Sequence, residues 1–245
     1  MSVMLGTKGI IGMTEMLGML GLEGIETFLG IPLDKIGVSI QETIYMVSIS
    51  LVIGSLFALM ISILLVFCRK GGLYQNAVVY NLINISINIV RSTPFVVLLI
   101  AVMPLTKVLI GTRIGPTAAI VPLTIYIIPF LARLMENSLL DTGKGIIEAA
   151  EAMGATPLQI IIYFILPESK GSLILSLTTG IVGLIGSSAM AGYIGGGGIG
   201  SLVLNYGYNR FNFELMYALV VLLIIVTQGV QSLGSFLATK ARKNV

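Results

Sequence analysis

Apolar residues occupy long stretches of this chain, and charged residues are concentrated in the shorter segments between them. A helix needs about 20 mostly apolar residues to cross the hydrocarbon core of a bilayer. Five stretches reach this length, so the pattern predicts five membrane-spanning helices. Backbone N–H and C=O groups in lipid must find partners within their own segment, so we expect an all-α integral membrane protein. The approximate ranges of the spans are 43–68, 77–106, 114–132, 172–193 and 215–238.

Two of the predicted spans contain residues that interrupt a regular helix. The second holds Arg91 and Pro94, and the third holds Pro116, Pro122 and Pro129, which we expect to make it irregular because proline removes a backbone donor. Arg91 is the one cation inside a predicted span. It either positions a gate or a partner helix, or lies near the inner interface and snorkels or bonds carbonyls freed beside Pro94. We favour the second interpretation.

Residues 1–40 do not continue the pattern, and we treat them as an N-terminal extension to a transmembrane domain at 41–245. Glu15, Glu23 and Glu26 fall within roughly 80° on a helical wheel, which favours an interfacial helix. A sixth span would carry three carboxylates into lipid at several kcal/mol. The start also lacks a basic segment followed by an uninterrupted apolar core, so we expect no cleaved signal peptide.

Between the third and fourth spans, residues 143–167 predict a hairpin of two short helices. Gly154 follows a run of helix formers and is expected to end the first helix in a left-handed conformation. Thr156 then caps a second helix, with Pro157 at its first position and Gln159 completing a capping box. Pro167 is expected to halt this second helix.

The distribution of Lys and Arg predicts the orientation. If the loop at 69–75, the hairpin and the C-terminal tail share one side, that side holds most of the cations and is cytoplasmic. Five spans then place the N-terminus outside and the C-terminus in the cytoplasm, with the hairpin facing the cytosol. The cytoplasmic set is Arg69, Lys70, Arg133, Lys144, Lys170, Lys240, Arg242 and Lys243, against Lys8, Lys35, Lys107, Arg113 and Arg210 outside.

Composition narrows the class of protein. The 245 residues are 56% hydrophobic and 10% charged, with a mean hydropathy of +1.02, which is more apolar surface than a soluble core can bury. The net charge of +3 is too small and dispersed for a nucleic-acid partner. Cys68 is the only cysteine, which excludes an intramolecular disulfide and a cysteine-only metal cluster.

The chemistry that the chain lacks is equally informative. No GxxxxGK[ST] loop is present to hold nucleotide phosphates, so the chain does not hydrolyse ATP by itself. It has no histidine, and its two aspartates, Asp34 and Asp141, lie outside the spans. These absences remove intramembrane proteases and a histidine-based metal site, and they weaken the case for a proton-coupled carrier. We therefore predict no catalytic, cofactor-binding or metal-binding residue and no enzymatic activity.

The hairpin sequence resembles the EAA loop of ABC importer permeases. The pattern is EAA, three residues, Gly, nine residues, an aliphatic residue, any residue and Leu-Pro; Phe164 departs from it at the aliphatic position. An ordinary amphipathic hairpin on the membrane surface is the alternative. The matching residues, which the resemblance assigns to coupling with an ATPase, are Glu148, Ala149, Ala150, Gly154, Leu166 and Pro167.

A second region, residues 184–211, resembles methionine-importer permeases in its SAMAG, GGGG and YGY elements, and residues 89–99 and 118–124 extend the likeness. We expect Gly195–Gly198 to allow close backbone approach at the outer end of a translocation pathway. No strand precedes these glycines, which disfavours a phosphate-binding loop. Candidate pathway residues are Ser187, Ser188, Met190 and Arg91, although helix packing explains the two serines and Met190 equally well.

The resemblance implies a type I ABC importer permease with a cytoplasmic EAA coupling hairpin, in the inner or plasma membrane. Two copies of the permease would form the pathway. Two ATPase subunits, binding ATP and Mg, would clasp the hairpins, where Glu148 helps to seat the contact. An extracytoplasmic methionine-binding protein would deliver the substrate. The alternatives are a same-fold importer for another amino acid or small peptide, and an ion-coupled carrier that works alone.

Overall fold

The computed structural model describes residues 22–72 and 74–243, and every regular element in this part of the chain is a helix. Four helices are long and apolar enough to span a membrane, and the bent pair α4–α5 has the length and composition of a fifth, broken span or of a re-entrant segment. The predicted all-α architecture is thus confirmed. The elements are α2 Leu22–Leu29, α3 Leu33–Cys68, α4 Ala77–Ser92, α5 Phe95–Ile110, α6 Pro116–Leu140, α7 Lys144–Ala152, α8 Pro157–Gln159, the π-helix η1 Ile160–Ile165, α9 Leu166–Glu168, α10 Lys170–Tyr193, α11 Gly198–Leu202, the π-helix η2 Val203–Tyr208 and α12 Phe213–Lys243.

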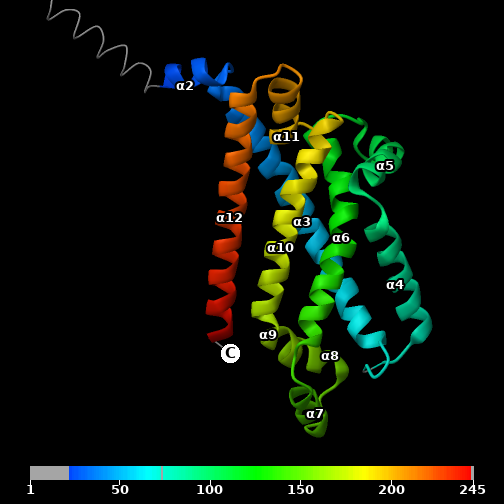
Figure 1. Ribbon diagram of the computed structural model, residues 1–245. Helices are drawn as coiled ribbons and strands as arrows, with labels where there is room; N and C mark the ends of the chain where they lie inside the picture. Colours follow the sequence, from blue (N-terminus) through cyan, green and yellow to red (C-terminus); the bar gives the residue numbers. More distant parts are fainter. Residues whose placement is uncertain (1–21, 73, 244–245) are drawn as a thin grey trace, which may run out of the picture.

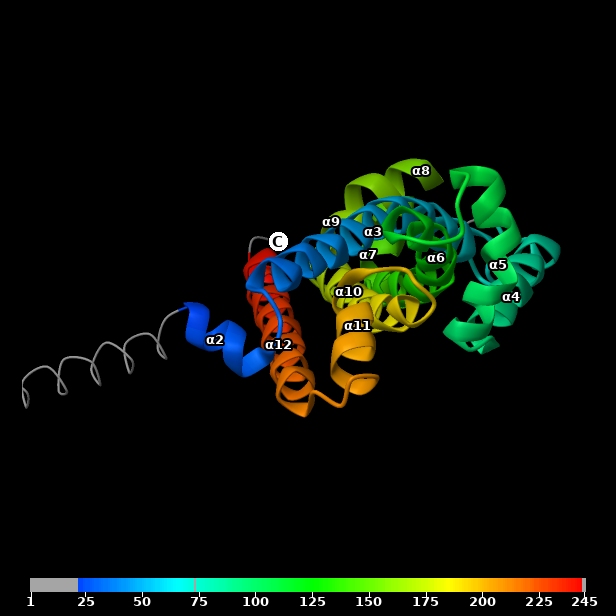
Figure 2. The ribbon, with the colours of Figure 1, turned by 90° about the horizontal axis from the view of Figure 1, so that it is seen from above.

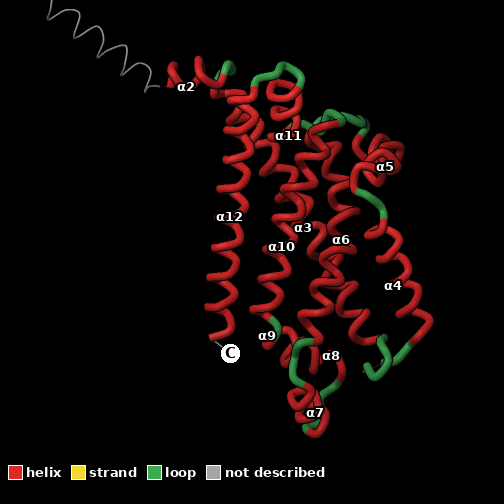
Figure 3. The backbone as a smooth tube through the Cα atoms, in the orientation of Figure 1, coloured by secondary structure: helices red, strands yellow, loops and turns green. Residues whose placement is uncertain are grey.

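The long helices run side by side, and the short elements gather at the two ends of the bundle (Figure 1). Helices α7–α9 project at one end, which we call the hairpin end; α3 and α12 also finish there. Helices α2, α5 and α11 lie at the opposite end, where α2 extends sideways from the bundle (Figure 2). Most loops lie at the two ends, and a short one joins α4 to α5 along the side of the bundle (Figure 3).

Helix α3 is longer than its predicted span. It has 36 residues, about 54 Å at 1.5 Å per residue, against a hydrocarbon core of about 30 Å. Its first residues, 33–42, are charged or polar enough to end the apolar stretch, but they do not end the helix. The helix therefore runs through the boundary that we drew at residue 40 and extends beyond the apolar stretch at the opposite end.

The N-terminal carboxylates are only partly within the described residues. Glu15 and the side chain of Glu23 lie outside them. Glu26 Oε1 accepts a hydrogen bond from Leu33 N–H at 2.7 Å, so its carboxylate stabilises the start of α3. The interfacial role of this segment stays a prediction.

The second predicted span is broken. Helices α4 and α5 meet at 109° across Thr93 and Pro94. Pro94 cannot continue the hydrogen bonding of α4, and it disfavours a helical conformation at Thr93. As a result α4 follows the bundle while α5 lies across the opposite end (Figure 1).

The third span is one continuous helix despite its prolines. Pro116 starts α6, where no backbone donor is needed, and Pro122 and Pro129 lie inside it without breaking it. The helix also continues to Leu140, past the predicted end at 132. A charge ends an apolar stretch but not a helix, because Arg and Glu are good helix formers. Arg133 and Glu136 form an ion pair within this last part of α6.

The core of the bundle lies between α3, α6 and α10. Its largest fully buried side chains include Met46 and Leu65 of α3, Leu123 and Ile127 of α6, and Leu184 of α10. Small residues at the contacts let these helices approach closely, and such residues are common where membrane helices pack together. For example, the hydroxyls of Ser138 in α6 and Ser176 in α10 lie 2.9 Å apart.

Candidate functional site

The corner of the hairpin has the predicted structure. Gly154 has a φ of +76°, and its N–H donates to Glu151 O at 2.9 Å. Ala155 N–H donates to Ala150 O at 3.1 Å, which completes a Schellman motif at the end of α7. The predicted capping box follows, with Thr156 N–H donating to Gln159 Oε1 at 2.8 Å. The corner is therefore held by backbone hydrogen bonds rather than by packing alone.

The second arm of the hairpin differs from the prediction. Pro167 does not halt it: residues 160–165 form a π-helix, α9 contains Pro167, and α10 begins at Lys170 after a single turn residue, Ser169. Pro167 lies in the first turn of α9, where its missing donor is tolerated. Ser169 N–H then donates to Ile165 O at 2.9 Å. The arm thus passes into α10 without a flexible loop.

One face of the hairpin is anchored to the bundle. Ala150 is fully buried, and Ile160, Ile161 and Ile165 pack with Val66 of α3 and Leu139 of α6 in a single apolar cluster. Phe164, the residue that departs from the EAA pattern, is half-buried in the same cluster. The hydroxyls of Thr142 and Ser169 lie 3.1 Å apart and join the two ends of the hairpin.

The other face of the hairpin is open. Glu148 and Ala149 are exposed, and the large apolar side chains of Met153 and Leu158 are 69% and 62% exposed. Leu166 and Pro167 are half-buried at the base of the second arm. Of the six residues assigned to coupling, Ala150 holds the hairpin in place, whereas Glu148 and Ala149 are available to a partner.

A charged cluster near the hairpin end was missed from the sequence. Arg133 Nη1 donates to Glu136 Oε2 at 2.6 Å, and the Glu136 side chain is only 3% exposed. Arg133 Nη2 donates to Asn84 Oδ1 and so ties α6 to α4. Two opposite charges three residues apart in an apolar helix were the signal for this pair.

At the opposite end, the glycine segment Gly195–Gly198 docks on α3. Glu42 Oε2 accepts from Gly198 N–H at 2.7 Å, and Thr43 Oγ1 accepts from Ile199 N–H at 3.0 Å. Gly197 has a φ of +76°, and a Cβ there would lie 2.7 Å from Glu42 Oε2. The backbone approach expected of these glycines is present. Glu42, which holds the segment, was missed from the sequence.

The same end contains a contact of backbone on backbone between α10 and α11. A Cβ on Gly200 would lie 2.1 Å from Ala189 O, and one on Gly192 would lie 2.3 Å from Ser201 N. No side chain separates the two helices there.

These contacts predict how much stability is lost when a side chain is added to the glycine segment. We expect Gly197→Ala to lower the free energy of unfolding by about 2 kcal/mol more than Gly115→Ala, as measured by thermal unfolding in micelles. Both glycines have a positive φ and an extended ψ, −161° at Gly197 and 167° at Gly115, but a Cβ on Gly115 meets nothing within 4 Å, so Gly115→Ala isolates the backbone strain. Equal losses in the two variants would contradict the close contact with Glu42.

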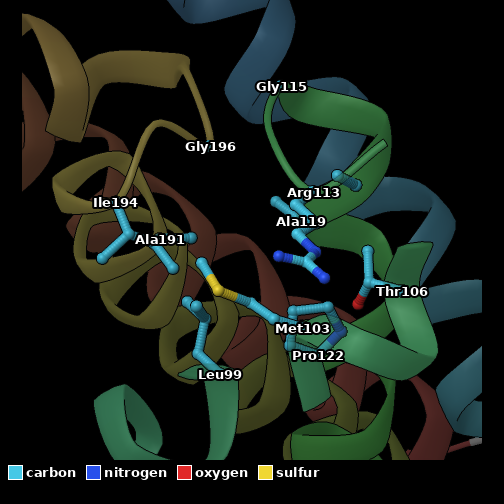
Figure 4. A pocket seen from close by; sticks show the side chains of 11 residues that line it. Leu99, Met103, Thr106, Arg113, Gly115, Ala119, Pro122, Ala191, Ile194 and Gly196 are labelled. Atoms are coloured by element: carbon cyan, nitrogen blue, oxygen red, sulfur yellow. The ribbon is translucent and has the colours of Figure 1, made fainter. Parts of the chain in front are cut away.

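A small pocket lies between α5, α6 and the end of α10 (Figure 4). The Arg113 guanidinium points into it toward Met103, Thr106 and Pro122, and Ala119 and Ile194 complete its wall. Its volume of about 20 Å³ is enough for about one water molecule. In this conformation the pocket does not hold an amino acid.

The four predicted pathway residues do not meet in one place. Ser187 and Ser188 are buried inside the bundle, where Ser188 Oγ donates to Ile185 O at 2.8 Å, while Met190 is 51% exposed. Arg91 is exposed in the last turn of α4, about 21 Å along that helix from Ala77, so it does not lie at the hairpin end as we expected. Their role in a pathway stays a prediction. Residues 22–72 and 74–243 contain no group of His, Cys, Asp or Glu able to hold a metal ion.

Comparisons with known proteins agree with these features. Residues 51–242 match the family model described as binding-protein-dependent transport system inner membrane component. The probable D-methionine transport system permease protein MetI of Vibrio cholerae is 44% identical over 199 residues, covering 81% of this chain and 88% of the relative. The methionine import system permease protein MetP of Bacillus subtilis is 41% identical over 174 residues, covering 71% and 78%.

Solved structures show the same likeness. A chain from the inward-facing MetNI methionine ABC transporter superposes with a TM-score of 0.83 at 39% identity, covering 85% of this chain and 97% of that chain. An amino acid ABC transporter crystallised with histidines has a TM-score of 0.71 at 18% identity, covering 85% and 94%, which shows likeness of fold alone.

Proposed function

We propose that this chain, which belongs to the family of binding-protein-dependent transport system inner membrane components, is the permease subunit of an ABC importer for methionine. The single observation that carries the proposal is the hairpin, whose corner is rigid, whose one face is anchored and whose other face is open. Relatives named for methionine transport support the substrate. As a member of this family the chain is a transport component, and ATP is hydrolysed by a separate subunit. A stand-alone ion-coupled carrier is thereby removed.

The assembly follows from the same proposal. Two copies of this chain form the pathway, and two ATPase subunits, which bind ATP and Mg, contact the two hairpins. An extracytoplasmic methionine-binding protein delivers the substrate. The protein lies in the inner or plasma membrane. Its hairpin end faces the cytoplasm, because most of the cations in the loops and the C-terminal tail lie at that end. The C-terminus is then cytoplasmic and the N-terminus outside.

The geometry suggests how ATPase movement reaches the pathway. An ATPase groove grips the open face around Glu148 and Ala149. The anchored face contacts the end of α3 and the end of α6, and the second arm continues directly into α10. A shift of the hairpin therefore moves these three helices together and switches the pathway between inward-open and outward-open states.

The proposal is tested by transport in lipid vesicles. This chain, reconstituted with its ATPase and binding protein, is expected to accumulate labelled methionine only when ATP is supplied and to show methionine-stimulated ATP hydrolysis. Vesicles lacking the ATPase serve as the control. Uptake without ATP would overturn the importer assignment. ATP-dependent uptake of another amino acid or a small peptide, but not of methionine, would keep the importer and replace the substrate.

A further inference from the structure

A polar cleft lies at the end opposite the hairpin, between the first turns of α3 and the α11–η2 segment. Its volume is about 310 Å³, at the lower end of the roughly 300–1,000 Å³ of small-molecule sites. On α3 it is lined by residues 34–42, which precede the predicted span at 43–68. One wall carries Asp34, Lys35, Val38, Ser39 and Glu42, and the other carries Gly198, Ser201, Leu202 and Tyr206.

Charges of both signs line this cleft. Asp34 and Glu42 lie eight residues apart on α3, about 12 Å along its axis, so they stand at the two ends of this wall of the cleft. Lys35 Nζ donates to Tyr206 Oη at 2.9 Å and lies 4.8 Å from the centre of its ring. Arg210 lies over the same ring at 4.3 Å. The hydrogen bond from Lys35 lowers the pKa of Tyr206 below its ordinary value.

The opposite charges in the cleft do not form ion pairs with each other. In the part of the chain that the structure describes, the one ion pair is that between Arg133 and Glu136 of α6, which do not line the cleft. The carboxylates and the ammonium group of the cleft thus remain separate, each facing the same space. Such an arrangement is complementary to a ligand that carries both charges.

Apolar surface accompanies the charges. Val38 is 54% exposed although it lies among polar residues, and Leu202 lines the opposite wall. We propose that the cleft binds a zwitterionic amino acid with an apolar side chain. The carboxylate of Glu42 takes the α-ammonium group, Lys35 takes the α-carboxylate, and the side chain lies against Val38 and Leu202. The inference rests on the proposed function, which makes methionine the ligand to test first.

The cleft is connected to the glycine segment through one side chain. Glu42 Oε2 already holds Gly198 N–H at 2.7 Å. A ligand ammonium group bound to Glu42 would therefore share this carboxylate with Gly198 N–H of the glycine segment. Occupation of the cleft and the position of the glycine segment are coupled by this carboxylate.

The experiment uses the fact that the chain contains no tryptophan. In Val38→Trp, purified as the full chain in micelles, methionine is expected to change the emission saturably. Methionine methyl ester, which lacks the carboxylate, and 4-(methylthio)butanoate, which lacks the amine, should each bind at least about tenfold more weakly. Leu56→Trp, at a position 61% exposed elsewhere on α3, should not respond.

Two second substitutions test the named groups. Glu42→Gln keeps an acceptor for Gly198 N–H but removes the charge, and Lys35→Met removes the ammonium group. Each should weaken methionine binding at least about tenfold in the Val38→Trp chain. Calorimetric titration of the chain with Val38 intact, and of its Glu42→Gln and Lys35→Met variants, measures methionine binding without the reporter.

The outcomes separate this inference from the proposed function. No saturable binding by either method, in a chain whose reconstituted complex imports methionine, overturns the cleft and leaves the importer intact. Binding of the ester and of the butanoate as tight as that of methionine also overturns it. Binding of another apolar amino acid but not methionine, with both charges required, supports the cleft and contradicts methionine as the substrate.

Discussion

Gly154→Val is expected to reduce methionine-stimulated ATP hydrolysis by the reconstituted complex about tenfold or more. The residue has a φ of +76°, a conformation that costs an L-residue about 1–2 kcal/mol and a β-branched one more. Relief of this strain would break the hydrogen bonds from Gly154 and Ala155 that hold the corner. The open face around Glu148 would then no longer be presented at a fixed angle to the ATPase.

Gly154→Asn is the matched control for this prediction. Asparagine tolerates the left-handed conformation, and a Cβ at this position meets nothing within 4 Å. We therefore expect Gly154→Asn to retain most of the stimulated activity. Equal loss in the two variants would show that the side chain obstructs a partner and that the backbone conformation is not the reason.

The second large effect is expected from Glu136→Leu. This change leaves the Arg133 guanidinium, which is mostly buried, without its carboxylate, and removing one partner of a buried pair typically costs about 3–5 kcal/mol. We expect a correspondingly large loss in the free energy of unfolding, measured by thermal unfolding of the chain in micelles. The contact of Arg133 with Asn84 in α4 does not supply a compensating negative charge.

A double substitution shows whether the loss comes from the unpaired charge. Arg133→Met together with Glu136→Leu removes both charges and should recover most of the stability lost by Glu136→Leu alone. If the double variant is as unstable as the sum of the single ones, the pair is not what holds this part of α6.

The hairpin corner was predictable because its determinants are local. Gly154, Thr156, Pro157 and Gln159 act on backbone groups within a few residues, and the structure has the expected Schellman motif and capping box. Pro167 was mispredicted because its effect depends on hydrogen bonding upstream. The π-helix at 160–165 and the position of Pro167 in the next first turn cannot be read from proline alone.

Contacts between distant parts of the chain were harder to predict from the sequence. Glu42 and Gly198 are 156 residues apart, and nothing in the sequence of either segment indicates that they meet. The start of α3 was placed too late because hydropathy marks the end of an apolar stretch and not the end of a helix. Whether the predicted pathway residues line a pathway is undetermined for another reason. A pathway formed by two copies of the chain cannot be deduced from the contacts within one copy. These residues are Ser187, Ser188, Met190 and Arg91.

The uninterrupted join between the hairpin and α10 has a kinematic consequence. Helix α10 spans 24 residues, about 36 Å, from Lys170 at the hairpin end to Tyr193, and near this far end Gly192 touches α11 backbone to backbone. At the hairpin end no flexible loop separates α9 from α10, so a tilt of the hairpin is transmitted to α10. At the other end α10 and α11 are in direct backbone contact, with no side chain between them that could change rotamer. A tilt of α10 at the hairpin end therefore displaces its other end, together with α11, at the same time.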